Sequence, residues 1–165
     1  MADRSTFSAE EWNRLMQGVM AAGIAVTAAD PSGLWGMLKE GMASSRALLG
    51  AKAGTGATQL STAIVEAFER SEDRNAARDG LQATLKGAKP DEIKTRCIET
   101  VRQAAAIVDA KAPADAAAFK SWLLQISQSV AEAAKEGGFM GFGGTPVSDA
   151  EKATVAEISG ALKVA

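Results

Sequence analysis

The chain has 165 residues, of which 47% are hydrophobic and 23% are charged, and its formal net charge at pH 7 is -2. This length and composition fit one globular domain with a hydrophobic core. The charge balance does not favour nucleic acid as a partner, because phosphate binding needs clustered lysine and arginine. Histidine is absent, which excludes Ser-His-Asp and Cys-His nucleophiles and the common zinc sites.

The chain has a single cysteine, Cys97. It excludes a disulfide within the chain and fits a reducing compartment, so we expect a cytoplasmic protein. Its register with the core face of a predicted helix indicates a buried, unreactive side chain. The first residues, MADRSTFSAEEW, show no basic segment followed by an apolar run. We therefore expect no signal peptide there, and we expect residues 1–7 to be flexible.

Hydrophobic residues recur with helical spacing along the chain, and no segment bounded by turn residues alternates with the period of a strand. We predict an all-α fold: a single-domain irregular bundle of about seven helices that spans residues 1–165. The predicted helices cover residues 8–29, 31–49, 58–70, 71–86, 91–109, 113–135 and 149–162.

The first predicted helix has a well-marked start. Ser8 and Glu11 form a capping box, in which hydroxyl and carboxylate satisfy backbone N–H groups reciprocally. Phe7 and Trp12 occupy hydrophobic-staple positions around that cap. From Leu15 onward the apolar residues cover more than one narrow stripe, which indicates a central, largely buried helix. This apolar run is shorter than the ~20 residues of a bilayer crossing, so we expect no membrane span.

The fourth predicted helix is less apolar. Ser71 is predicted to cap it, with Glu72 and Asp73 in the first turn, where the helix dipole favours acids. Its only large apolar residues are Leu81 and Leu85, so we expect it to be peripheral. The many alanines elsewhere in the chain favour close contacts between helices.

A glycine- and phenylalanine-rich segment, residues 136–147 (EGGFMGFGGTPV), is predicted to be a loop between the last two helices. Its glycines allow positive φ and so permit a helix end and a turn. Phe139, Met140 and Phe142 either plug the core or contact a partner. The GFGG sequence is similar to a phosphate loop, but phosphate loops follow a strand and this one follows a helix. We assign no cofactor to it.

Carboxylates at Glu66, Glu69 and Asp73 recur with helical spacing, and such oxygens can hold a hard cation. Arg70 and Arg74 interleave with them, however, and mixed charge on a helix is more typical of a salt-bridged surface. We therefore predict no metal site.

Two stretches resemble segments of a family of small uncharacterised bacterial proteins: AADPSGLWGMLKE (Ala28–Glu40) and EAAKEGGFMGFGGTPVSDAE (Glu132–Glu151). The resemblance implies a small bacterial α-helical protein without an assigned function. It implies no catalytic or binding residue.

The sequence supports three functional hypotheses. The preferred one is a non-catalytic helical interaction or scaffold module that self-associates or binds a protein through Phe139, Met140 and Phe142. The alternative is a binder of a small apolar or lipid-like ligand between helices, since methionine-rich surfaces adapt their shape, although core packing explains the same residues. Its pocket would comprise Trp12, Met16, Met20, Trp35 and Met37. The least favoured is an enzyme that uses carboxylates such as Asp30 or Glu136.

Overall fold

The computed structural model describes residues 1–29, 58–136 and 149–164, and their fold is all-α. In this part of the chain six α-helices follow a short 3-10 helix, where the sequence predicts about seven helices in all. Their bounds are η1 Arg4–Thr6, α1 Ala9–Ala28, α3 Gln59–Glu69, α4 Ser71–Leu85, α5 Pro90–Lys111, α6 Pro113–Glu136 and α7 Asp149–Leu162. These bounds agree closely with the predicted ones. The predicted helix over 31–49 lies outside the described residues.

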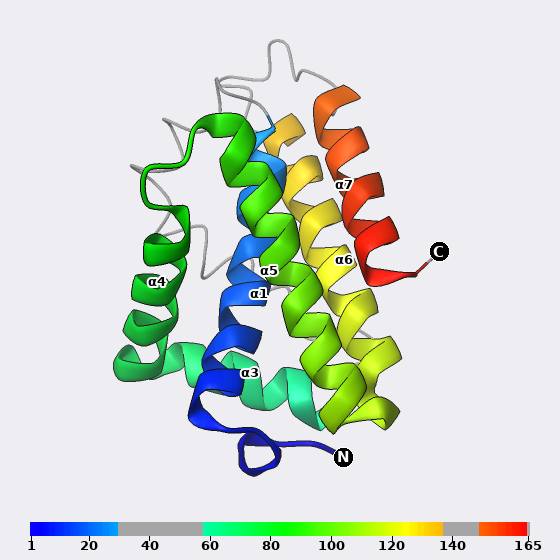
Figure 1. The fold of residues 1–165 in the computed structure, drawn as a ribbon. Coiled ribbons are helices and arrows are strands. Elements are labelled where there is room, and N and C mark those ends of the chain that lie inside the picture. Colours follow the sequence, from blue (N-terminus) through cyan, green and yellow to red (C-terminus); the bar gives the residue numbers. More distant parts are fainter. Residues whose placement is uncertain (30–57, 137–148, 165) are drawn as a thin grey trace.

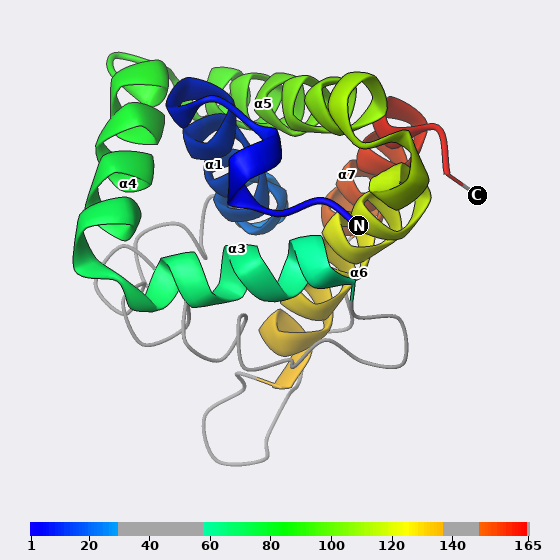
Figure 2. The same cartoon turned by 90° about the horizontal axis from the view of Figure 1, so that it is seen from below.

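Helix α1 is the centre of the bundle. It contacts each of the other described helices, with α5, α6 and α7 alongside it and α3 crossing one end (Figures 1 and 2). As predicted, α4 is peripheral: it lies at one edge of the bundle (Figure 1), and its buried residues are Ala77 and Leu81.

Burial around α1 explains why it is central. Between Leu15 and Ala28 every side chain is buried, apart from the partly buried Met20 and Ile24. A helix that is apolar on all sides must be covered on all sides, so the predicted central helix is confirmed. The fully buried large side chains that pack with it from α5, α6 and α7 include Val101, Val108, Phe119, Leu123, Ile158 and Leu162.

Small residues let neighbouring helices approach α1 closely. A Cβ atom built on Gly18 would lie only 2.5 Å from the Cβ of Ala104 in α5. Further along, the buried Ser127 hydroxyl of α6 donates to the Ala22 carbonyl of α1 at 2.9 Å. Bulkier side chains at these positions would hold the helices apart. The close contacts agree with the expectation drawn from the many alanines of the sequence.

The predicted start of α1 is confirmed in detail. The Glu11 N–H donates to Ser8 Oγ at 3.1 Å, and the Ser8 N–H donates to Glu11 Oε2 at 2.8 Å. The hydrogen bond from the Ser8 backbone, helped by the charge of Lys111, lowers the pKa of the Glu11 carboxyl. The rings of Phe7 and Trp12 lie 6.1 Å apart, as the staple requires.

One local prediction differs from the structure. Arg70, and not Ser71, is the N-cap of α4, and no side chain caps that helix. The reason is that α3 continues to Glu69, so a single residue joins the two helices and Ser71 already belongs to the first turn. In the N-terminal segment Ala2 and Phe7 are buried against the bundle, and the flexibility expected for residues 1–7 stays a prediction.

Candidate functional site

A hollow of about 510 Å³ lies between α5, α6 and the C-terminal end of α7. Ligand pockets in proteins commonly have volumes of about 300–1,000 Å³ and combine apolar walls with a few convergent polar groups. This hollow has both features, and we treat it as the candidate functional site.

Short side chains create the hollow. Helix α5 contributes Ala105 and Ala106 to its lining, and α7 contributes Gly160 and Ala161. A Cβ atom built on Gly160 would meet no atom within 4 Å, so the space above this glycine is open. The wall between the two helices is therefore lined by backbone and methyl groups that a partner can approach closely.

Two acidic side chains of the lining are engaged in ion pairs. Lys120 Nζ lies 2.7 Å from Asp109 Oδ1, which ties the start of α6 to the end of α5. Glu157 Oε1 of α7 lies 3.0 Å from Lys94 Nζ of α5. These pairs leave little negative charge for a ligand to meet inside the hollow.

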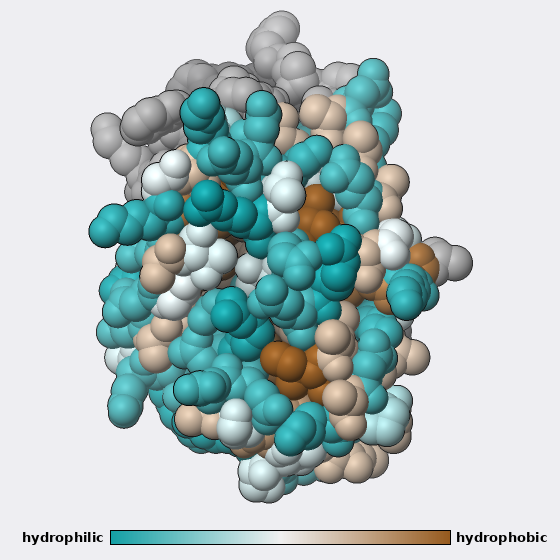
Figure 3. Space-filling model, viewed as in Figure 1, coloured by the Kyte–Doolittle hydropathy of each residue, from teal (hydrophilic) through white to brown (hydrophobic). Residues whose placement is uncertain are grey.

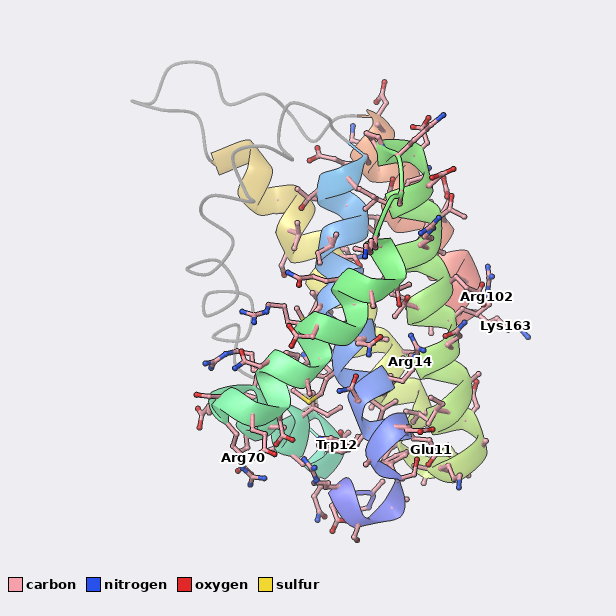
Figure 4. The ribbon with its side chains drawn as sticks, turned by 60° about the vertical axis from the view of Figure 1, so that its left-hand side comes forward. Glu11, Trp12, Arg14, Arg70, Arg102 and Lys163 are labelled. Carbon is pink, nitrogen blue, oxygen red and sulfur yellow. The ribbon has the colours of Figure 1, made fainter. Side chains whose placement is uncertain are left out.

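Two further cations, Arg102 and Lys163, line the same hollow from α5 and from the residue after α7. Figure 4 shows them close together on one side of the molecule. Arg102 Nη1 lies 2.5 Å from Glu99 Oε2 in an exposed pair within α5. Lys163 has no ion-pair partner among the described residues, so its positive charge in the lining of the hollow is not offset by a neighbouring acid of that part of the chain.

Lys163 has an unusual backbone conformation. Its φ is 56°, in the left-handed region that glycine normally occupies after a helix. The Lys163 N–H donates to the Gly160 carbonyl at 3.2 Å, and the Val164 N–H donates to the Ser159 carbonyl at 3.2 Å. This is the hydrogen-bond pattern of a Schellman motif, with lysine in place of glycine.

A second hollow, of about 210 Å³, lies between the N-terminal segment, α1 and α4. Trp12 and Met16 line it together with Arg4, Glu72 and Asp73. Arg4 Nη1 lies 2.8 Å from Asp73 Oδ1, and the guanidinium carbon lies 5.8 Å from the centre of the Trp12 ring. The indole Nε1 of Trp12 is buried and has no hydrogen-bond partner in the part of the chain that the structure describes.

The predicted apolar pocket is only partly described. Trp12 and Met16 come together at the second hollow, where their exposed fractions are 2% and 1%. Met20 is partly buried and packs against the core. The predicted site residues that lie outside the described part of the chain are Trp35, Met37, Phe139, Met140 and Phe142.

The structure also describes the single cysteine and the three acids that were weighed as metal ligands. Cys97 is buried as predicted, and burial raises the pKa of its thiol to about 12. Glu66 and Glu69 are exposed, and Asp73 pairs with Arg4. Across residues 1–29, 58–136 and 149–164, no three acidic, cysteine or histidine side chains gather as metal ligands would. None of the described helices has a stretch long and apolar enough to cross a bilayer.

The sequence analysis did not identify Arg102 and Lys163 as site residues. Arg102 and Lys163 are far apart in the chain and carry no motif. The one local signal was a helix end without glycine: the chain reads Leu162-Lys163-Val164 where a Schellman motif usually has glycine.

Comparison with known proteins adds no functional information. The chain matches no protein-family model, no curated protein and no solved structure. The resemblance of Ala28–Glu40 and Glu132–Glu151 to a bacterial family therefore stays a prediction. The class of the protein is that of an all-α helical bundle, and its function has to be argued from the site itself.

Proposed function

We propose that this protein is a non-catalytic interaction module that uses the hollow between α5, α6 and α7 to bind an acidic segment of a protein partner. The two cations of its rim, Arg102 and Lys163, would receive a carboxylate of that segment. The small residues of the wall would receive an adjacent apolar side chain, because they leave open space between the helices.

The observation that carries this proposal is the conformation of Lys163. A non-glycine residue in the left-handed region costs roughly 1–2 kcal/mol relative to a relaxed conformation. Glycine would end α7 without this cost. Backbone strain of this kind clusters at functional sites, and here it places a cation at the rim of an open hollow.

The other rim cation is available to a partner at little energetic cost. The pair between Arg102 and Glu99 is exposed on both sides, and such surface pairs contribute only about 0–1 kcal/mol. A guanidinium also binds a carboxylate through two parallel hydrogen bonds, which adds directionality to the contact. Arg102 therefore exchanges its own glutamate readily for an acid of the partner.

Photo-crosslinking in cells of the source organism tests the proposal. A photoreactive amino acid replaces Gly160, where the structure has room for a side chain, or Gln82, which is exposed on α4. We expect a discrete protein adduct from position 160 alone. Arg102→Glu should reduce that adduct at least about tenfold, a loss typical of an interface arginine. The matched control Arg78→Glu, which reverses an exposed charge on α4, should leave it unchanged. Equal adducts from both positions would refute the use of this hollow.

Self-association through the predicted glycine- and phenylalanine-rich loop, residues 136–147, is a separate part of the proposal and is supported by the sequence. Phe139, Met140 and Phe142 are large apolar residues separated by glycines, a composition suited to a contact with a second copy. Size-exclusion chromatography with light scattering should show an oligomer for the wild type and a monomer for Phe139→Ser/Phe142→Ser. If the wild type is itself monomeric, this part is wrong.

The second hollow favours an alternative function, the binding of a small ligand. The motivating observation is the buried Nε1 of Trp12, which has no hydrogen-bond partner within residues 1–29, 58–136 and 149–164. Trp12 also lines the hollow. Buried polar groups normally have a partner, which can be a bound molecule. Because Arg4 and Asp73 also line the hollow, a ligand with a polar end fits it better than a lipid chain. Native mass spectrometry of protein isolated from cells should detect such a ligand, and a consistent absence of added mass would exclude it.

A further inference from the structure

Helix α4 has little apolar contact with the rest of the bundle. Of its 15 residues, Ala77 and Leu81 are buried. The largest fully buried side chains of the described chain come from α1, α3, α5, α6 and α7, and none of them from α4. Figure 3 shows a mostly hydrophilic surface over this helix, at the left edge of the molecule. The hydrophobic free energy that holds α4 in place is therefore small for a helix of this length.

The face of α1 that meets α4 is partly polar. A Cβ atom built on Gly80 of α4 would collide with the side-chain amide of Gln17. That amide is satisfied within α1 itself, because it donates to Asn13 Oδ1 and accepts from Arg14 Nη1 at 2.9 Å. Helix α4 can therefore move away from Gln17 without breaking these hydrogen bonds.

Two polar contacts tie the ends of α4 to other elements. In its first turn, Asp73 Oδ1 lies 2.8 Å from Arg4 Nη1. In its last turn, the Thr84 carbonyl accepts a hydrogen bond from Arg96 Nη1 of α5 at 2.9 Å. The side chains of Arg4 and Arg96 are 49% and 41% exposed, so water competes for both contacts and each contributes little to stability.

The chain connections at both ends of α4 are suited to act as hinges. Arg70 alone joins α4 to α3, in an extended conformation with φ -80° and ψ 122°. Gly87, whose φ is 73°, lies in the turn that leads to α5. Hinge motions change the backbone at a few residues at the ends of elements. Changes at Arg70 and Gly87 would move α4 as one body.

Helix α4 covers the second hollow. Glu72, Asp73 and Ala76 contribute one wall, and Trp12 and Met16 of α1 contribute another. Figure 4 shows Trp12 beside the start of α4. Nε1 of Trp12 is sealed from solvent and has no hydrogen-bond partner in the described part of the chain. A donor buried in this way destabilises the closed state, and a ligand reaches it only after a covering element moves.

We propose that α4 is a lid, which swings away from α1 on hinges at Arg70 and Gly87 and admits a ligand with a hydrogen-bond acceptor to Trp12 and Met16. The inference rests on the small-ligand function proposed for this hollow. It adds the route of entry and the acceptor group that the indole N–H requires. The remaining helices stay folded during the opening, because they hold the large buried side chains of the core.

Thiol labelling of the ligand-free protein tests the lid. Met16→Cys puts a thiol in the hollow, and the native Cys97, buried in α5, reports unfolding of the core in the same molecule. The folded protein is treated with iodoacetamide at pH 8, and peptide mass spectrometry separates the two thiols. Opening of one element needs less free energy than unfolding of the whole. Position 16 should therefore be modified at least about tenfold faster than Cys97.

Two substitutions distinguish opening of α4 from fraying of the N-terminal segment. Arg4→Ala removes the contact at one end of α4, and Arg96→Ala removes the contact at the other end, which is not part of the hollow. If α4 moves as one body, each should raise the labelling rate at position 16 about two- to fivefold, the range for an exposed pair. The matched control Arg78→Ala, which breaks a pair within α4, should leave the rate unchanged.

Hydrogen exchange of the wild type covers the case in which Met16→Cys fails to fold. The amides of residues 75–85 should exchange as one group, with protection at least about tenfold lower than in α1 and α5. Equal labelling of position 16 and Cys97, no effect of Arg96→Ala, or equal protection of α4 and α5 would each overturn the lid. No ligand takes part in these measurements. An opening lid in a protein that carries no ligand in native mass spectrometry would thus support the lid and refute the ligand function alone.

Discussion

The close approach of α1 and α5 makes a quantitative prediction about Gly18. Replacing it by alanine puts two Cβ atoms 2.5 Å apart, one on Gly18→Ala and one on Ala104. Carbon atoms in contact prefer about 3.5–4.0 Å, so the helices would have to separate by about 1 Å. Neither methyl group can rotate away, since each is fixed directly to a helix backbone.

Two opposing effects decide the size of the change at Gly18. Alanine stabilises a helix interior by about 1 kcal/mol relative to glycine. Overpacking of a tight core costs about 1–3 kcal/mol, and a contact between two backbone-fixed groups belongs at the upper end. The net expectation is that Gly18→Ala lowers the free energy of unfolding by about 2 kcal/mol.

Urea denaturation of four proteins measures this effect: the wild type, Gly18→Ala, Ala104→Gly and the double variant. The double variant moves one methyl group from α5 to α1 and relieves the clash, so the two substitutions should couple by at least about 1 kcal/mol. A Gly18→Ala protein more stable than the wild type would show that helix propensity alone acts there. The inferred close packing would then be refuted.

Three further predictions concern single residues. Lys163→Gly should raise the free energy of unfolding, measured by heat or urea, by about 1 kcal/mol, because it removes the strain of the left-handed conformation. The same substitution should weaken the protein adduct that forms from the photoreactive residue at position 160. Ser127→Ala should lower the free energy of unfolding by about 1 kcal/mol, because it removes the buried bond to α1; the exposed Ser121→Ala serves as the control and should stay within about 0.5 kcal/mol of the wild type. The Cys97 thiol should resist iodoacetamide at pH 8 until the protein unfolds, and stability should fall as the pH rises from 9.0 toward 12, because the unfolded thiol then loses a proton that the folded one keeps.

The fold was predictable where local chemistry decides it. The capping box of Ser8 and Glu11 starts α1 as expected, and Pro113 opens α6. The central position of α1 followed from its apolar residues on every side, because such a helix can satisfy them only inside a bundle. Ser71 misled the prediction, since a serine followed by two acids has the sequence of a cap even where the preceding helix runs up to it.

The hollow and its cations could not be predicted for a different reason. A hollow depends on how α5, α6 and α7 pack together, and that packing is set by the whole core and not by any local pattern. Alanine and glycine at Ala105 and Gly160 fit tight packing as well as an open wall. The left-handed conformation of Lys163 could not be predicted either, because glycine, and not lysine, is the residue expected in that conformation after a helix end.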